Sequence, residues 1–229
     1  MRVLAVSDEE LPALALRSSR LRPELILGAG DLSAAYLESL IERYQVPCVY
    51  VPGNHDPDMT GFRYSAGGFV RAGLPAEHPG PRGGRNADAT VVREAGLAVA
   101  GLGGCMRYNG GPNQWTERAQ ARRARRTRRR ARRVPSVDVL LTHSPAAGIG
   151  DEPDGAHRGF ACVGDLAARL RPRVLLHGHV HPHGRRPPDR GVPLPGGGTV
   201  PVLNVVGYVY LELPPGGGPV TVMERRYGA

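Results

Sequence analysis

The stretch Pro47–Asp56 reads PCVYVPGNHD, a short apolar run followed directly by a glycine and three polar residues. An apolar run bounded by Pro and Gly is typical of a buried strand. Two similar runs stand upstream: Arg2–Ser7 (RVLAVS) precedes Asp8, and Glu24–Leu27 (ELIL) leads into Asp31. Strands that place polar residues at their carboxyl ends are typical of α/β proteins, in which sites form along that edge of the sheet.

The same pattern returns downstream. Val137–Leu141 (VDVLL) leads to His143, and Arg173–Leu176 (RVLL) leads to His179 and His181. Gly and Pro enrichment predicts loops over 57–88, 101–112, 144–159 and 182–198. The remaining periodic segments predict helices over 34–44 (capped by Ser33), 115–133 and 162–170, a hairpin over 89–102, and terminal strands over 200–206, 208–213 and 220–224. We find no internal repeat and no linker, so we expect a single domain over residues 1–229.

Composition excludes several classes of protein. The 229 residues are 41% apolar, 22% charged and 5% aromatic, which excludes a disordered, collagen-like or coiled-coil chain. No apolar run is long enough to cross a membrane, and the N-terminal apolar run is too short for a secretory signal. Three scattered cysteines make a disulfide framework implausible, so we expect a cytoplasmic protein.

The net charge of +9 is concentrated in one segment. Residues 118–133 hold ten Arg and no acidic residue, and the rest of the chain is nearly neutral. On a helix, the small side chains of this segment form a narrow stripe that can pack on a sheet while Arg side chains face solvent; the stripe is Gln120, Ala124, Thr127 and Ala131. Such a field also attracts RNA, DNA or another polyanion without sequence preference, and salt weakens that attraction.

Five strand ends thus carry ligand-type side chains. Two divalent ions about 3.5–4 Å apart require a bridging carboxylate with further carboxylate and imidazole ligands. The order of the blocks resembles the calcineurin-like metallophosphoesterase family: Asp8, Gly30-Asp31, Gly53-Asn54-His55-Asp56, His143 and Gly178-His179-Val180-His181. The runs 142–145 and 155–159 are similar to the cyclic-nucleotide-phosphodiesterase-like branch. The resemblance implies a two-sheet β-sandwich flanked by helices.

The resemblance also implies roles for individual residues. Asp31 corresponds to the carboxylate that bridges both ions. The other ligands would be Asp8 and His181 for the first ion, and Asn54, His143 and His179 for the second. His55 corresponds to the residue that contacts the phosphate and protonates the leaving oxygen. Asp56 would hold His55 in its tautomer.

Glu10 departs from the family pattern, which has His two residues after the first Asp. Alternate residues of a strand point the same way, so the Glu10 carboxylate can reach the first ion. Its hard oxygen favours Mn²⁺ or Fe²⁺, with Zn²⁺ as an alternative. If Glu10 instead faces solvent, the first site is degenerate. Candidate substrate contacts are Arg107, Asn109 and His157.

The sequence therefore predicts a metal-dependent phosphoesterase. Nucleotide-like phosphodiesters are the first substrate class, hydrolysed by a water made nucleophilic between two ions, and phosphomonoesters stay open. One alternative is a nuclease that holds a polynucleotide on the arginine segment. Another is a non-catalytic binding protein with a degenerate first metal site at Glu10.

Overall fold

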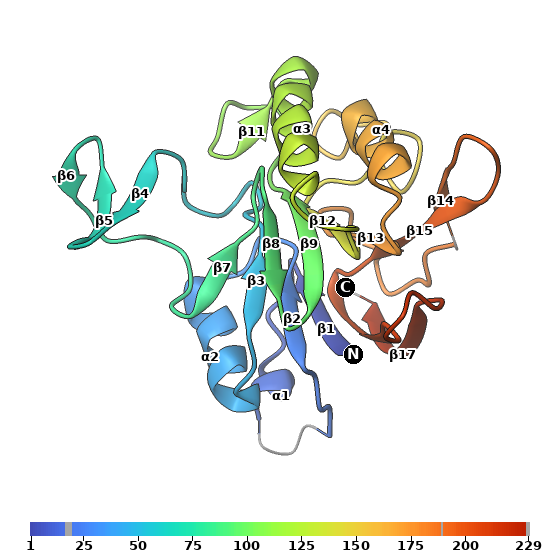
Figure 1. Ribbon diagram of the computed structural model, residues 1–229, viewed down its shortest axis with the longest axis horizontal. Helices are drawn as coiled ribbons and strands as arrows, with labels where there is room; N and C mark the ends of the chain where they lie inside the picture. The colour runs from blue at the N-terminus through green and yellow to red at the C-terminus, as the bar shows by residue number, and fades with distance from the viewer. Residues whose placement is uncertain (17–19, 189, 228–229) are drawn as a thin grey trace.

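The computed structural model describes residues 1–16, 20–188 and 190–227 (Figure 1). Two six-stranded sheets form its centre. The first has the order β17 (Thr221–Tyr227), β16 (Gly207–Glu212), β1 (Arg2–Ser7), β2 (Leu25–Gly28), β3 (Cys48–Tyr50) and β7 (Gly84–Asn86). The second has the order β14 (Arg190–Pro193), β15 (Thr199–Asn204), β13 (Val174–His177), β12 (Val139–Thr142), β9 (Leu97–Leu102) and β8 (Val91–Glu94).

The two sheets pack face to face, and helices cover their outer faces. One buried cluster joins Val3 and Leu27 of the first sheet to Leu141 and Leu176 of the second. Outside the first sheet lie α1 (Pro12–Ala15) and α2 (Ala34–Tyr44), and outside the second lie α3 (Glu117–Ala131) and α4 (Ala161–Leu170). The expected α/β sandwich flanked by helices is confirmed.

Strand β1 shows why the central runs are apolar throughout. Val3 and Ala5 face the cluster between the sheets, whereas Leu4 and Val6 face the cluster that includes α2. Because successive side chains of a strand point to opposite faces, a strand covered on both sides needs apolar residues at every position. The parallel pairing of β1 with β2 and of β2 with β3 brings their carboxyl ends to one edge. In the second sheet, β9, β12 and β13 are likewise parallel.

Three predicted loops contain strands. Residues 57–88 include β7 and a small outlying sheet of β4 (Phe62–Ser65), β5 (Gly68–Arg71) and β6 (Leu74–Pro75). Residues 101–112 contain β10 (Cys105–Met106), which pairs with β11 (Gln114–Trp115), and 182–198 contain the edge strand β14. These strands are short and bury little, so they lack the hydrophobic alternation by which a strand is recognised in a sequence.

The arginine segment forms α3, slightly shorter than the predicted 115–133. The Thr116 side chain caps it by accepting a hydrogen bond from the Ala119 amide at 3.2 Å. Gln120, Ala124 and Thr127 of the expected stripe are buried, and Ala131 is half-buried. Among the helices of the described ranges, none is long and apolar enough to cross a membrane.

Replacement of Leu141 by Ala should destabilise the protein strongly. Leu141 is fully buried between the two sheets, and the cavity left by the change costs about 2–5 kcal/mol of unfolding free energy. Urea unfolding followed by circular dichroism measures the change. Met223→Ala, at a side chain that is 51% exposed, is the control and should shift stability by less than about 0.5 kcal/mol. Equal effects of the two changes would contradict this placement of the core.

Candidate metal centre

The polar residues predicted at the strand ends lie along one edge of the sandwich. Asp8 follows β1, Asp31 follows β2, His143 follows β12 and His179 follows β13. Three of them adopt a left-handed backbone, with φ of 62° at Asp8, 54° at Asp31 and 68° at His179. This conformation is strained for residues other than glycine and persists only where the surroundings enforce it, commonly at functional sites.

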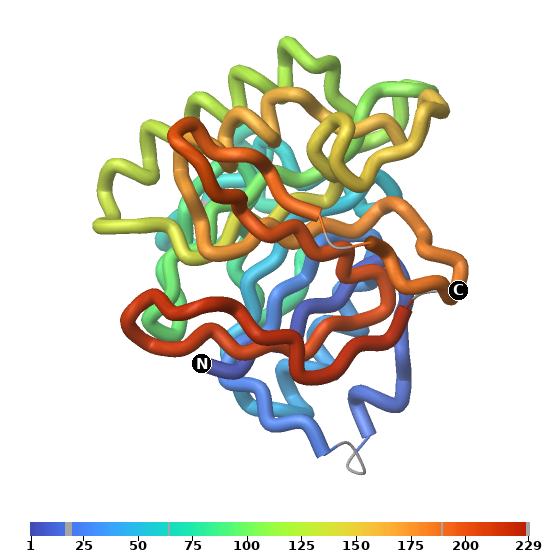
Figure 2. Tube along the Cα trace, turned by 90° about the vertical axis from the view of Figure 1, so that its right-hand side faces the viewer, coloured from blue at the N-terminus to red at the C-terminus, as the bar shows by residue number. Residues whose placement is uncertain are grey.

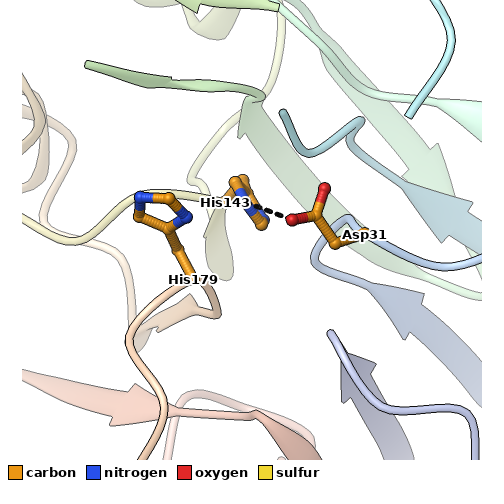
Figure 3. Close-up of side chains that lie close together, drawn as sticks. All are labelled: Asp31, His143 and His179. Carbon is orange, nitrogen blue, oxygen red and sulfur yellow. Dashed lines mark ion pairs between the residues drawn. The ribbon is translucent and has the colours of Figure 1, made fainter. Parts of the chain in front are cut away.

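Asp31, His143 and His179 bring their ligand atoms together. One atom from each lies within 4.8 Å of the other two (Figure 3). His143 Nδ1 lies 2.8 Å from the Ala29 carbonyl oxygen, which can only accept, so Nδ1 carries a proton. His143 Nε2 then faces two oxygens, Asn54 Oδ1 at 3.0 Å and Asp31 Oδ2 at 3.3 Å. An imidazole lone pair opposite two oxygens is stable only with a cation between them, either a proton or a metal ion.

The charges of this pair follow from that arrangement. Burial disfavours an ionised Asp31, but attraction to His143 and hydrogen bonds outweigh it and lower the Asp31 pKa to about 2. Burial also opposes a charged His143, yet Asp31 outweighs it and raises the His143 pKa to about 9. Without a metal ion the second proton of His143 supplies the cation. A divalent ion fits the same position, with oxygen and nitrogen donors already turned toward it.

His179 is prepared in a similar way. Its Nε2 donates to the Ala156 carbonyl oxygen at 2.8 Å, which leaves Nδ1 as the unprotonated nitrogen. Figure 3 shows this ring turned toward His143, and the two ring centroids are 4.8 Å apart. Burial, followed by repulsion from His143, lowers the His179 pKa to about 3. A histidine that donates one nitrogen to a carbonyl and keeps the other free is the usual form of a metal ligand.

Asp8 and His181 form the neighbouring part of the site. Asp8 Oδ2 accepts hydrogen bonds from Ser7 Oγ at 2.5 Å and from the His179 amide at 3.0 Å. His181 Nε2 lies 3.9 Å from Asp8 Oδ1. Burial raises the Asp8 pKa. Gly178 allows the backbone before His179 to lie against Ser7 and Asp8. A Cβ at this position would collide with Ser7 Oγ and Asp8 Oδ2.

The loop after β3 places His55 and Asp56 differently. The His55 side chain is exposed, and its backbone amide donates to Asp31 Oδ1 at 2.8 Å. Asp56 is buried, and its Oδ2 accepts from the amides of Gly53 at 2.7 Å and Asp31 at 3.0 Å. The Asp56 carboxylate therefore fixes the backbone that carries both His55 and Asp31. Its expected contact with the His55 ring stays a prediction.

Glu10 has a different partner. Its Oε1 accepts from the Ser33 amide at 2.7 Å, and its side chain is exposed. Ser33 is the N-cap of α2, so this contact joins the loop after β1 to the start of that helix. The ligand cluster around Asp31 does not include Glu10, and its binding of the first ion stays a prediction.

The candidate substrate residues lie on loops around the centre. The Arg107 and Asn109 side chains are exposed, and Asn109 Oδ1 accepts from Gln114 Nε2 at 2.6 Å. The His157 ring centroid lies 5.3 Å from that of His179, and its Nδ1 lies 2.9 Å from Asp154 Oδ2. Ligand atoms of Glu152, Asp154 and His157 also approach one another within 4.8 Å, in a more exposed loop.

Asn113 is a positioning residue that the sequence did not reveal. It is buried, and its Nδ2 donates to the carbonyl oxygens of Gly53 at 2.9 Å and Asp56 at 3.0 Å. Asn113 therefore holds the loop that carries Asn54 and His55. The sequence does not indicate this role, because Asn113 lies in a glycine-rich stretch. The residues that it contacts are 57 and 60 positions away in the chain.

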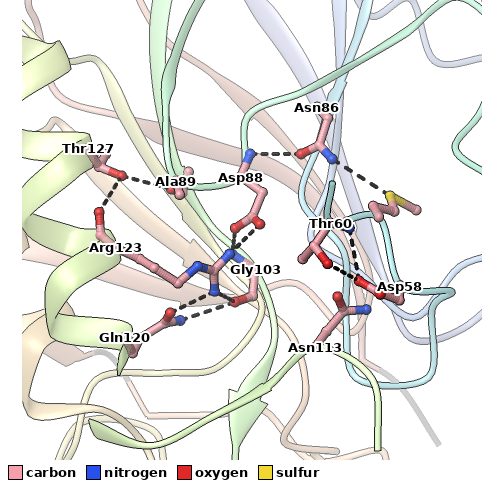
Figure 4. A network of polar contacts seen from close by, with 12 residues as sticks. Asp58, Thr60, Asn86, Asp88, Ala89, Gly103, Asn113, Gln120, Arg123 and Thr127 are labelled. Atoms are coloured by element: carbon pink, nitrogen blue, oxygen red, sulfur yellow. Dashed lines mark hydrogen bonds and ion pairs between the residues drawn. The ribbon is translucent and has the colours of Figure 1, made fainter. Parts of the chain in front are cut away.

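A second network attaches the same region to α3 (Figure 4). The Gly103 amide donates to Asp88 Oδ1 at 2.7 Å, and its carbonyl oxygen accepts from Gln120 Nε2 at 3.1 Å and Arg123 Nη1 at 3.2 Å. Arg123 also forms an ion pair with Asp88. The Gly104 amide donates to the Pro52 carbonyl oxygen at 2.8 Å, just before the Asn54 loop. Part of the arginine helix thus supports the site rather than facing solvent.

The chain is similar to known proteins in sequence and in fold. A family model described as calcineurin-like phosphoesterase matches residues 7–183. One crystal structure superposes with a TM-score of 0.63 at 15% identity and covers 97% of this chain and 98% of its own. The crystal structure of TT1561 of Thermus thermophilus gives a TM-score of 0.55 at 16% identity, covering 92% of this chain and 93% of its own. No curated protein matches the sequence.

Replacement of Asn113 by Ala should loosen the Asn54 loop. The change leaves the buried Gly53 and Asp56 carbonyl oxygens without their donor, which costs about 1–3 kcal/mol of unfolding free energy. Hydrogen exchange of the backbone amides of residues 53–56 should quicken. Asn113→Gly tests the backbone separately, since glycine accepts the φ of 52° at this position but lacks the amide. Protection retained in both variants would show that the Asn113 side chain does not hold the loop.

Proposed function

The chain belongs to the calcineurin-like phosphoesterase family, whose members hydrolyse phosphoric esters with metal ions, and on this premise we propose that it is a phosphodiesterase for nucleotide-like esters. The observation that carries the proposal is the position of His143 Nε2 opposite Asp31 and Asn54. This arrangement accommodates a cation in a buried, polar position.

Two sets of residues would hold two divalent ions. Asp31 would contribute to both sets. Asp8 and His181, with Glu10, would complete the first set, and Asn54, His143 and His179 the second. The oxygen-rich first set favours Mn²⁺ or Fe²⁺ over Zn²⁺. Bound there, two ions would supply a nucleophile from water and neutralise charge on the phosphoryl group.

Side chains near the metal centre would donate a proton and bind the ester group. His55 is exposed at the edge of the centre, while its amide is anchored on Asp31. It would hold a proton at a ring nitrogen and donate it to the leaving oxygen. A cavity of about 460 Å³ borders Asp31 and His55, and Tyr50 and Met59 contribute apolar surface to it. That surface supports an organic ester group beside the scissile phosphate.

Replacement of His55 by Ala should slow hydrolysis of bis-p-nitrophenyl phosphate by about 10²–10⁴-fold in kcat, the usual contribution of a general acid. Metal-stripped protein titrated with Mn²⁺ provides the assay. His78→Ala is the matched control, because His78 packs on Phe62 and Phe69 in the outlying sheet. Absence of turnover with this diester, beside turnover of p-nitrophenyl phosphate, would replace the diesterase assignment with a monoesterase.

The exposed side of α3 favours a second candidate function, a nuclease. Five exposed arginines lie on the helix, Arg118, Arg122, Arg125, Arg126 and Arg129, and two more, Arg132 and Arg133, directly follow it. Two hollows between α3 and α4, of about 270 and 470 Å³, share Arg128 and Arg169. This surface would hold the phosphates of a polynucleotide while the metal centre cleaves it.

A variant carrying Arg122→Gln, Arg125→Gln and Arg129→Gln separates the two functions. A nuclease should lose at least about tenfold in cleavage of single-stranded RNA or DNA, with steep salt dependence in the wild type. Hydrolysis of bis-p-nitrophenyl phosphate should not change. Equal polymer cleavage by both proteins would exclude the arginine surface from substrate binding.

A further inference from the structure

A second cavity, of about 570 Å³, lies beside the metal centre on its His181 side. Its walls come from the loop 150–152, from the ends of β13 and β15, and from residues 180–188 and 190. In Figure 2 the orange segment after β13 runs close to the red end of β17. Arg225 of β17 lines the same cavity, and its Nη2 donates to the Asn204 carbonyl oxygen at the end of β15 at 2.6 Å.

His177 lines this cavity with a side-chain nitrogen that is available to a ligand. The side chain is 2% exposed, and Nδ1 lies 2.9 Å from the Gly178 carbonyl oxygen, so Nδ1 carries a proton. Within the described ranges, Nε2 has no hydrogen-bond partner, although His177 lines the cavity. A polar atom of a buried side chain is costly to leave without a partner unless a ligand or water satisfies it. Because Nδ1 carries the proton, Nε2 is an acceptor, and a hydroxyl group can pair with it as donor.

Gly150 allows the loop backbone to pack closely against His177 and Arg190. A Cβ at this residue would lie 2.9 Å from His177 Nε2 and 3.2 Å from Arg190 Nη1. Both nitrogens therefore lie close to the Gly150 backbone and close to each other. With φ of +90°, this backbone suits glycine and disfavours any residue whose side chain would displace them. A hydroxyl donor at His177 and an anionic group at Arg190 can thus be bound side by side in the cavity.

The charge of the cavity is positive. Arg185, Arg186, Arg190 and Arg225 line it, against the acidic Asp151 and Glu152. The Asp151 carboxylate is occupied by backbone amides, those of Gly148 at 2.8 Å and Gly159 at 3.0 Å. Arginine binds phosphate through two parallel hydrogen bonds, so this lining favours a phosphate group over a neutral one.

The cavity is coupled to the metal centre through the backbone. Asn204 Nδ2 donates to the Val180 carbonyl oxygen at 2.6 Å, between His179 and His181. His181 lines the cavity and also approaches Asp8. A ligand in the cavity therefore lies beside the first set of metal ligands, where a substrate can reach both.

We propose that this cavity binds a second phosphate and an adjacent hydroxyl of the substrate, as in a phosphorylated sugar, with Arg190 and His177 as specificity-determining residues. The proposal rests on the phosphodiesterase function. It narrows the substrate class to esters that carry a further phosphate on the sugar.

Calorimetric titration in the presence of Mn²⁺ tests the proposed phosphate site, because it measures ligand affinity without requiring hydrolysis. Adenosine 3′,5′-bisphosphate should bind the wild type at least about tenfold more tightly than adenosine 5′-monophosphate, the value of one charge-assisted contact. Arg190→Gln should abolish that preference. Arg122→Gln, the same change on the exposed face of α3, should retain it. Equal affinities for the two nucleotides in the wild type would overturn the proposal, as would a preference that survives Arg190→Gln.

The contact between His177 and a substrate hydroxyl is tested by comparing the affinities of two ligands that differ only in that hydroxyl. 2′-Deoxyadenosine 3′,5′-bisphosphate should bind the wild type more weakly than the ribose form, and His177→Ala should remove that difference. A difference that persists in His177→Ala would exclude this residue from the contact.

Hydrolysis of bis-p-nitrophenyl phosphate separates this proposal from the underlying function. That ester has no second phosphate, so its hydrolysis by the wild type reports the phosphodiesterase function alone. Turnover of the ester without any bisphosphate preference would overturn the cavity assignment alone. A bisphosphate preference without turnover of any diester would overturn the phosphodiesterase function and confirm the phosphate site.

Discussion

The contact between Asp31 and His143 joins the two sheets at the edge where the chemistry is placed. Asp31 follows a strand of the first sheet, and His143 follows a strand of the second. His143 Nδ1 also bonds the Ala29 carbonyl oxygen of the first sheet, so one imidazole spans the sandwich. Because sheets pack at a separation set by their side chains, about 10 Å, the buried apolar core determines how far apart these ligands stand. The geometry of the site therefore depends on the packing of the core.

Burial strengthens the contact between Asp31 and His143, but it also makes unpaired polar groups there costly in free energy. Asp31, Asn54, His143 and His179 are polar groups at or near full burial, where each needs a partner. Backbone carbonyl oxygens satisfy the outer nitrogen of each histidine, and backbone amides satisfy Asp31 and Asp56. The remaining side-chain oxygens and nitrogens of these residues point toward one another. Without a cation between them, their lone pairs would repel. Strained backbones at Asp8, Asp31 and His179 are tolerated because these contacts hold them.

Much of this could be predicted from the sequence because it is local. The central strands are covered on both faces and therefore read as apolar runs, and the ligands follow each run directly. Asn113 and Gly150 could not be predicted, since their importance comes from contacts with residues distant in the chain. The outlying strands β4 to β6 were missed because they bury little and so carry no alternation. For Glu10 the strand rule does not apply, because β1 ends at Ser7 and Asp8 has a left-handed backbone; the Glu10 side chain instead bonds the Ser33 amide.

The most direct test of the central claim is a crystal structure of the Mn²⁺-soaked protein with anomalous data collected at the manganese edge. The account predicts two anomalous peaks about 3.5–4 Å apart, with the Asp31 carboxylate between them and His143 Nε2 on one of them. A single peak, or peaks at Glu152, Asp154 and His157 with none beside Asp31, would contradict it.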